Sequence, residues 1–195
     1  TIARSKSIIG PYESNPNNPI LTHRHLGKNY PIINVGHGDL VEVQDGSWWM
    51  VLLGCRVYEG HHGNLGRETF LVPVEWENDW PIVNPGIGLV EDTGVAPALP
   101  EFYITPEDSC DHFDGEELDN KWVSLRGPKE AFCSLSERPG YLRLRLQKTT
   151  IRELLSPSLI VRRQQHINFI ASTIMEFSPK SKEESAGLIL IQSDK

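Results

Sequence analysis

The chain has 195 residues, of which 38% are hydrophobic and 23% charged, and this composition is that of an ordinary globular protein rather than a disordered one. Its formal net charge of -7 and pI of about 5.5 argue against nucleic acid and anionic membranes as partners, because binding phosphate groups needs clustered Lys and Arg. No stretch approaches the roughly 20 apolar residues of a membrane span. A neutral substrate suits this chain better.

The cysteines and the start of the chain give little information on compartment. Cys55, Cys110 and Cys133 are too widely spaced for a disulfide framework or a zinc site, so both a secreted and a cytoplasmic location fit. The first residue is Thr1, and no charged-then-apolar signal segment follows it. We therefore expect a piece of a longer protein.

Short β-rich runs bounded by Gly, Pro, Asn and Asp predict an all-β fold. Residues 1–6 are expected to form a strand, and residues 10–19 a connection rich in Pro and Asn. A hairpin of residues 39–44 and 47–53 follows, because Asp45-Gly46 can supply the positive φ angles of a type I′ turn.

The second strand of this hairpin is apolar on both faces. Its alternating side chains are Trp48, Met50 and Leu52 on one face and Trp49, Val51 and Leu53 on the other. Such a strand must be covered on both sides, which is typical of a propeller blade with neighbours stacked against it. A second hairpin, residues 68–76 and 80–83 around the Asn78-Asp79 turn, would complete a four-stranded unit.

A change of composition indicates a second domain. The Pro-rich residues 94–106 predict a semi-rigid linker and place a boundary near residue 105, giving domains of residues 1–104 and 105–195. The acidic residues 107–119 are expected to be a solvated linker and strand entry. Further strands are predicted at residues 141–147, 159–163, 169–177 and 187–191. The last would leave an open sheet edge, so we expect the chain to be truncated at its C-terminus too.

Arg67 is the first candidate for ligand binding. It follows a loop with two glycines and directly precedes a strand, and its planar fork can bond two neighbouring sugar hydroxyls or one carboxylate. The alternative is a structural Arg paired with Glu68 or another nearby acid, which is the commoner case for such a residue. The adjacent His61 and His62 would point to opposite sides, make a poor metal pair, and are expected on the loop surface.

His37 is the second candidate. It stands between Gly36 and Gly38 just before a strand, where the backbone can turn sharply and the ring can orient a carboxylate or approach a metal ion. A hydrogen-bonded turn histidine is the more ordinary interpretation. The five tryptophans could stack on sugars, but their apolar neighbours favour a place in the core.

Several segments resemble glycoside hydrolase family 43, of the β-xylosidase and α-L-arabinofuranosidase type. They are residues 2–13 (IARSKSIIGPYE), 36–42 (GHGDLVE), 64–70 (NLGRETF) and 74–76 (VEW) for the propeller, and residues 111–114 (DHFD), 118–122 (LDNKW) and 162–166 (RRQQH) for the β-sandwich that follows it. Their order and spacing fit the family. The resemblance implies the last blades of a five-bladed β-propeller followed by an incomplete, concanavalin-like β-sandwich of jelly-roll type.

The resemblance also implies a function and two site residues. Family members hydrolyse glycosides with inversion, using an Asp base, a Glu acid and a further Asp, and all three acids precede the part of the family that this chain matches. Arg67 matches the Arg that holds the terminal sugar, and His37 the His near the propeller axis that orients the base or approaches a bound ion. The resemblance implies no required cofactor and allows a calcium ion near the propeller axis.

We therefore expect the longer protein to release terminal xylose or arabinose from xylo- or arabino-oligosaccharides. The missing propeller blades and the rest of the sandwich would be partners of this chain, which alone should be inactive because Asp39, Glu42 and Glu68 match no catalytic position. The choice between xylose and arabinose stays open. The alternative is a sugar-binding or purely structural β-protein without hydrolysis.

Overall fold

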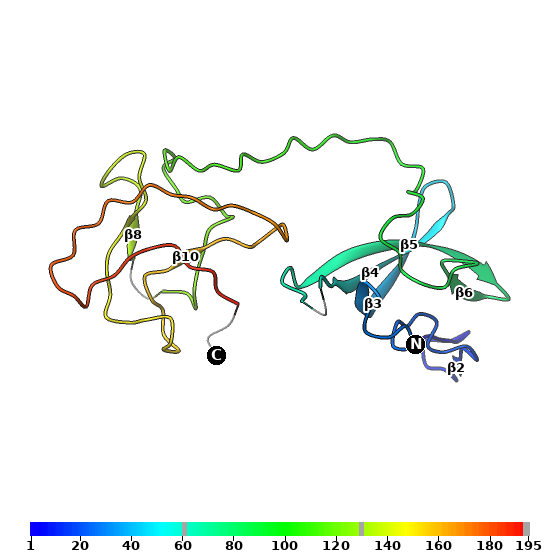
Figure 1. Cartoon of the computed structure of the whole chain (residues 1–195). Helices are drawn as coiled ribbons and strands as arrows, with labels where there is room; N and C mark the ends of the chain where they lie inside the picture. Colours follow the sequence, from blue (N-terminus) through cyan, green and yellow to red (C-terminus); the bar gives the residue numbers. More distant parts are fainter. Residues whose placement is uncertain (60–61, 129–130, 193–195) are drawn as a thin grey trace. The chain divides into compact units, whose positions relative to one another are not determined.

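The computed structural model of the protein describes residues 1–59, 62–128 and 131–192 (Figure 1). The chain forms two compact units, Thr1–Phe102 and Tyr103–Lys195. Every regular element in the described residues is a β-strand, so the all-β prediction is confirmed. None of the described residues belongs to a helix that could cross a membrane.

The first unit is built on a four-stranded antiparallel sheet with the strand order β3-β4-β5-β6 (Figure 1). The strands are β3 (Ile32–Glu42), β4 (Trp48–Arg56), β5 (Arg67–Glu77) and β6 (Trp80–Val83). Each strand pairs antiparallel with the next one along the chain. The predicted four-stranded unit is present, with β3 and β4 longer than expected.

The turn between β3 and β4 differs from the prediction. Gly46 has a φ of 84°, but Asp45 does not have the positive φ that a type I′ turn requires. Instead, the Gly46 amide donates to Val43 O and the Val43 amide donates to Ser47 O, both at 2.9 Å. This is a longer loop closed by a glycine bulge, and Asp45 Oδ1 stabilises it by accepting a 2.9 Å bond from the Ser47 amide.

The turn between β5 and β6 forms where the sequence predicts it. Asn78 and Asp79 have φ angles of 50° and 59°, and Glu77 pairs with Trp80 on either side of them. Positive φ at both central residues matches the right-handed twist of the flanking strands, and Asn and Asp tolerate that conformation better than most residues. The local sequence therefore fixes the register of this hairpin.

One face of the sheet carries the core of the unit. Its buried residues are Ile32, Met50, Leu52, Phe70, Val72, Val74, Val83 and Val90. Gly54 lies within this core, and a Cβ there would be 3.0 Å from the Phe70 ring and 3.3 Å from Ile32 Cγ2, so the strand passes closer to its neighbours than an alanine would permit.

The opposite face is not covered as predicted. Val41, Val51 and Leu71 are 43%, 37% and 45% exposed, and the register places all three on this face together with the buried Trp49. Neighbouring blades would be needed to cover such a face, and the described residues of this unit do not supply them. The prediction of burial on both sides thus fails for these residues within the structure described.

The start of the unit contains a small additional sheet. Strands β1 (Ala3–Arg4) and β2 (Glu13–Ser14) pair antiparallel, so the predicted connection at residues 10–19 contains a strand and the predicted strand at residues 1–6 is short. An ion pair of 3.1 Å joins Arg4 Nε to Glu13 Oε2 across the pair, and the Arg4 guanidinium lies 4.1 Å from the centre of the Trp80 ring. The contact between Arg4 and Trp80 attaches the pair to β6.

The second unit contains only short strands. They are β7 (Val123–Ser124) paired with β10 (Ile160–Val161), and β8 (Cys133–Ser134) paired with β9 (Arg143–Leu144). The predicted strands at residues 141–147 and 159–163 shrink to β9 and β10, and no strand forms at residues 169–177 or 187–191. A strand requires hydrogen-bonded neighbours, and these apolar segments have none in the described chain.

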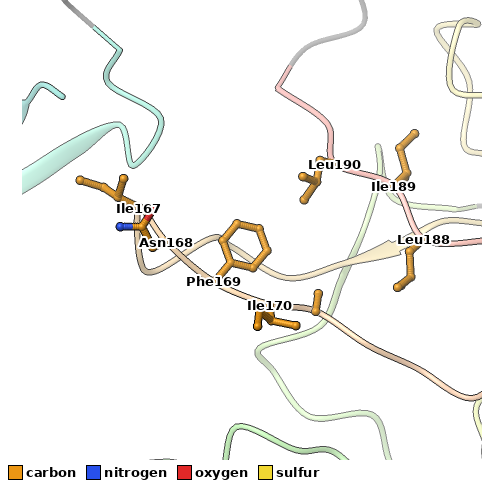
Figure 2. Close-up of a pocket in the computed structure, with 8 residues that line it drawn as sticks. Ile167, Asn168, Phe169, Ile170, Leu188, Ile189 and Leu190 are labelled. Carbon is orange, nitrogen blue, oxygen red and sulfur yellow. The ribbon is translucent and has the colours of Figure 1, made fainter. Parts of the chain in front are cut away.

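The last two of these segments line an open apolar groove of about 820 Å³. Figure 2 shows Phe169 and Leu190 extending from the two segments toward the space between them. Ile170 and Leu190 are 97% and 79% exposed, which is unusual for large apolar side chains in a finished core.

A side-chain cluster holds the opening of the second unit. Trp122 Nε1 donates to Asp111 Oδ2 at 2.6 Å, the Phe113 amide donates to Asp111 Oδ1 at 2.9 Å, and Lys121 Nζ lies 3.4 Å from Asp111 Oδ2. The Arg162 guanidinium lies 5.6 Å from the centre of the Trp122 ring. Asp111 is therefore part of a packed cluster, and the prediction that the whole acidic run is solvated is wrong at this residue.

This cluster predicts that the second unit is sensitive to acid. The hydrogen bond from Trp122, followed by the Phe113 amide and Lys121, holds the pKa of Asp111 below its ordinary value of 3.8. A carboxylate with a depressed folded-state pKa contributes stability above its unfolded pKa, and this contribution is lost as the pH falls through the folded pKa. We expect the wild-type unit to lose stability below about pH 4, and the variant Asp111→Asn to lose less of it over that range.

Urea titrations at several pH values, monitored by the indole N–H resonance of Trp122 in NMR spectra, measure how the stability of the second unit depends on pH. The variant Asp114→Asn removes the same charge from an exposed side chain and serves as the control. Identical pH dependence in the wild type and Asp111→Asn would contradict the assignment.

Candidate functional site

Arg67 begins strand β5 and stands opposite Cys55 of β4. Its side chain is exposed and makes no hydrogen bond or ion pair with the other described residues. The expected alternative, pairing with Glu68, is wrong, because Glu68 Oε1 instead lies 3.4 Å from Arg56 Nε. Successive residues of a strand point to opposite faces, so Glu68 and Arg67 serve different sides of the sheet.

His37 lies in an irregular part of β3. The pairing of β3 with β4 shifts between Gly36 and Asp39, and His37 has a φ of 54°, as the two flanking glycines allow. A Cβ at Gly38 would lie 2.8 Å from Met50 Sδ, so this glycine lets the bulge approach the core closely. The His37 side chain is exposed.

The sheet register relates the two candidates. Gly36, next to His37, stands opposite Leu53 on one side of β4, and Arg67 stands opposite Cys55 on its other side. With neighbouring strands about 4.8 Å apart and a rise of about 3.3 Å per residue, the Cα atoms of Gly36 and Arg67 lie roughly 12 Å apart. Both candidates therefore lie at the same end of β4. Their backbones are close enough for the two side chains to reach one small ligand between them.

Neither candidate lines either of two grooves formed by the described residues. One groove lies at residues 167–190 of the second unit, and a smaller one beside β6 is lined by residues including Asn15, Asn17 and Trp80. Within the described residues there is no group of three or more His, Cys, Asp or Glu that could hold a metal ion. No such cluster therefore surrounds His37 in the described part of the chain.

The other candidates take ordinary places, with one exception. His62 is exposed and forms a bridge with Tyr58, while His61 lies outside the described residues. Trp49 and Trp80 are buried and Trp48 and Trp122 partly buried, in keeping with the expected core. Trp76 is 44% exposed, so its assignment to the core is wrong. It lies near the end of β5 and packs edge-on against Trp48, with ring centres 5.2 Å apart.

Sequence reasoning missed His23, a buried residue that joins distant segments. Its Nδ1 donates to Ile32 O at 2.7 Å, because a carbonyl oxygen can only accept, and its Nε2 accepts a 3.0 Å bond from the Val90 amide. Tyr30 packs edge-on against the ring, and its hydroxyl donates to Val90 O at 3.0 Å. Burial, followed by the charges of Glu91 and Asp92, raises the pKa of that hydroxyl. We call this arrangement the Val90 clamp.

Comparison with known sequence families gives two matches in the order that the sequence predicts. Residues 1–81 match the model for glycosyl hydrolases family 43, and residues 110–195 match the model for the β-xylosidase C-terminal concanavalin A-like domain. The two units thus correspond to a propeller part and a concanavalin-like part, as the fold prediction states.

Curated relatives match the chain along its whole length. It is 43% identical over 198 residues to a xylosidase/arabinosidase of Butyrivibrio fibrisolvens and 44% identical over 195 residues to a non-reducing end α-L-arabinofuranosidase of Bacteroides ovatus. Both matches cover 100% of this chain but only 38% and 36% of the relatives. The chain therefore spans little more than a third of their length.

Solved structures give the same result. The family 43 protein of the Bacteroides ovatus xyloglucan locus matches with a TM-score of 0.76 and 44% identity, over 83% of this chain and 32% of that one. The xylan β-1,4-xylosidase of Bacillus halodurans matches with a TM-score of 0.77 and 40% identity, over 84% and 31% of the two chains. With both family models matched in order and relatives aligned from end to end, the chain belongs to family 43 of the glycosyl hydrolases.

Proposed function

We propose that this chain is part of a longer glycosidase that releases terminal xylose or arabinose from hemicellulose oligosaccharides with inversion of configuration. The observation that carries the proposal is similarity along the whole chain, at 43% and 44% identity, to two relatives whose names state xylosidase/arabinosidase and α-L-arabinofuranosidase activity. The relatives differ in the sugars they name, so the proposal covers both pentoses.

Arg67 is the proposed sugar-binding residue. Its exposed guanidinium has no partner among the described residues, so the fork is available to donate two hydrogen bonds to neighbouring hydroxyls of the terminal sugar. A neutral sugar also suits a chain with a net charge of -7 better than an anionic ligand would. Arg67 would thus fix the orientation of the sugar ring.

His37 is the proposed orienting residue. Its left-handed backbone conformation is costly for a residue other than glycine, and such strain is concentrated at functional sites. From the same end of β4 as Arg67, the imidazole could hydrogen-bond to a catalytic carboxylate and hold it in one rotamer. This role needs no metal ion, and the described residues contain no group of three or more His, Cys, Asp or Glu that could hold one.

The hydrolytic carboxylates are proposed to come from elsewhere in the longer protein. An inverting enzyme places its acid and base about 6.5–9.5 Å apart so that water fits between the base and the sugar. Asp39, Glu42 and Glu68 are not assigned to these roles, and Glu68 already pairs with Arg56. The exposed apolar face of Val41, Val51 and Leu71 would receive a neighbouring propeller blade, and the apolar groove of the second unit further sandwich strands.

Hydrolysis of aryl xylosides and aryl arabinofuranosides tests the proposal. The full-length protein should turn over at least one of these substrates, and NMR of the first product should show the inverted anomer. The 195-residue chain alone should show no turnover above buffer, because it lacks the proposed acid and base. Sugar binding without hydrolysis by the full-length protein would favour a binding protein and contradict the proposal.

A further inference from the structure

Arg56 joins the segments that surround Arg67. It is the last residue of β4, where its Nε lies 3.4 Å from Glu68 Oε1 of β5 and its Nη1 donates to Asp92 Oδ1. Its guanidinium also lies 5.4 Å from the centre of the Phe70 ring, which is buried in the core. One side chain therefore connects the end of β4, the start of β5 and the segment after β6.

Arg67 lies directly beside this junction. Cys55 and Arg67 form the last pair in the register of β4 and β5, and the next pair inward is Gly54 with Glu68. The end of a strand pair frays unless side chains hold it. Gly54 has no side chain that could contact Glu68 across the strand pair. The ion pair between Arg56 and Glu68 therefore helps to hold this end of the β4–β5 pairing together.

We propose that Arg56 is a positioning residue for Arg67, acting through Glu68 and Asp92. This inference rests on the proposed function, because it assigns Arg67 to the sugar. Glu68 and Arg67 are consecutive residues, so their side chains point to opposite faces of the sheet. When Arg56 holds the Glu68 side chain on one face, it also fixes the direction in which the Arg67 side chain points on the other. Asp92 binds Nη1 of the same guanidinium, whereas Glu68 binds its Nε. This second bond holds Arg56 in place when the end of the strand pair frays.

A purely structural ion pair makes a different prediction. The side chains of Arg56 and Glu68 are 34% and 31% exposed and that of Asp92 is 51% exposed, and pairs at such exposure contribute little to global stability. A displacement of about 1 Å in a substrate-positioning group, by contrast, can reduce the rate about 100-fold. Positioning thus predicts a large kinetic effect with a small change in melting temperature.

The chain offers a matched control in Arg4. Its side chain is 37% exposed, it pairs with Glu13 at 3.1 Å across two strands, and it lies over the Trp80 ring, so it resembles Arg56 in exposure and in types of contact. Arg4 belongs to β1, which does not pair with the sheet that carries Arg67. The variants Arg4→Gln and Arg56→Gln therefore remove similar interactions at different distances from the proposed site.

The experiment is a double-mutant cycle in the full-length protein, with kcat and KM measured on the aryl pentoside it hydrolyses best. We expect Arg56→Gln to lower kcat/KM at least 10-fold and Arg4→Gln less than 2-fold, with Arg56→Lys recovering part of the loss because it keeps one ion pair. In an Arg67→Ala background, Arg56→Gln should have almost no further effect, since the residue it positions is gone.

The outcomes separate this inference from the proposed function. Full activity of Arg67→Ala would show that Arg67 does not bind the sugar, and both proposals would fail. If Arg67→Ala strongly lowers kcat/KM, two results would overturn the positioning role alone. One is that the losses from Arg56→Gln and Arg67→Ala are additive; the other is that Arg56→Gln has no larger effect than Arg4→Gln. If Arg56→Gln does not fold, the same cycle is carried out with Asp92→Asn. This variant removes the ion pair between Asp92 and Arg56 by changing an exposed side chain.

Discussion

Replacing His23 with alanine is expected to lower the free energy of unfolding of the Thr1–Phe102 unit by about 3–5 kcal/mol. The His23 ring donates to Ile32 O and accepts from the Val90 amide, and it is 6% exposed. Alanine would leave that carbonyl and that amide buried without partners, at a cost of about 1–3 kcal/mol each, and would remove the packing against Tyr30. Few substitutions outside the apolar core should cost as much.

Urea denaturation of the chain followed by tryptophan fluorescence measures this loss, and hydrogen exchange of the Val90 amide locates it. The control is His25→Ala, which removes the same ring from an exposed position two residues away and should change stability by less than about 0.5 kcal/mol. If His23→Ala were no more destabilising than His25→Ala, or if Val90 kept its protection in the variant, the Val90 clamp would not stabilise this unit.

The second large effect concerns Arg67. In the full-length protein, Arg67→Ala is expected to lower kcat/KM about 100-fold or more, because two charge-assisted hydrogen bonds to the sugar contribute about 3 kcal/mol or more together. Arg67→Lys should lose at least about 10-fold, since an ammonium keeps the charge but cannot donate the two parallel bonds of the guanidinium. The melting temperature should stay close to that of the wild type, because the side chain makes no hydrogen bond or ion pair with the described part of the chain.

Steady-state kinetics on aryl pentosides provides the measurement. Arg24→Ala removes an exposed Arg elsewhere in the same unit and should leave the kinetics unchanged. Wild-type kinetics in Arg67→Ala would show that Arg67 does not bind the sugar. An equal loss of kcat/KM in Arg24→Ala would indicate a nonspecific effect of charge.

The hairpins of the first unit could be predicted because their information is local. The Asn78-Asp79 pair tolerates positive φ angles, and the apolar runs on either side of it set the register, so β5 and β6 form as expected. The Asp45-Gly46 turn shows the limit of the same reasoning. Here the Asp45 side chain caps the Ser47 amide and favours a longer loop than the dipeptide alone indicates.

Features that depend on distant partners could not be predicted in this way. The bonds of His23 reach residues 32 and 90, and nothing in the neighbouring sequence shows that both segments return to it. Residues 169–177 and 187–191 have the composition of strands but lack neighbours to pair with in the described chain. Local sequence makes Arg67 and His37 candidates and the family resemblance strengthens them, but only the sheet register places both near the same end of β4.

The most direct test of the proposed site is a crystal structure of the full-length protein with xylose or arabinose bound. We predict that the Arg67 guanidinium donates to two hydroxyls of the sugar at about 2.7–3.2 Å. We also predict that His37 contacts a carboxylate supplied by a part of the protein outside this chain. A sugar bound away from Arg67, with His37 facing solvent and no carboxylate beside it, would contradict the proposed site.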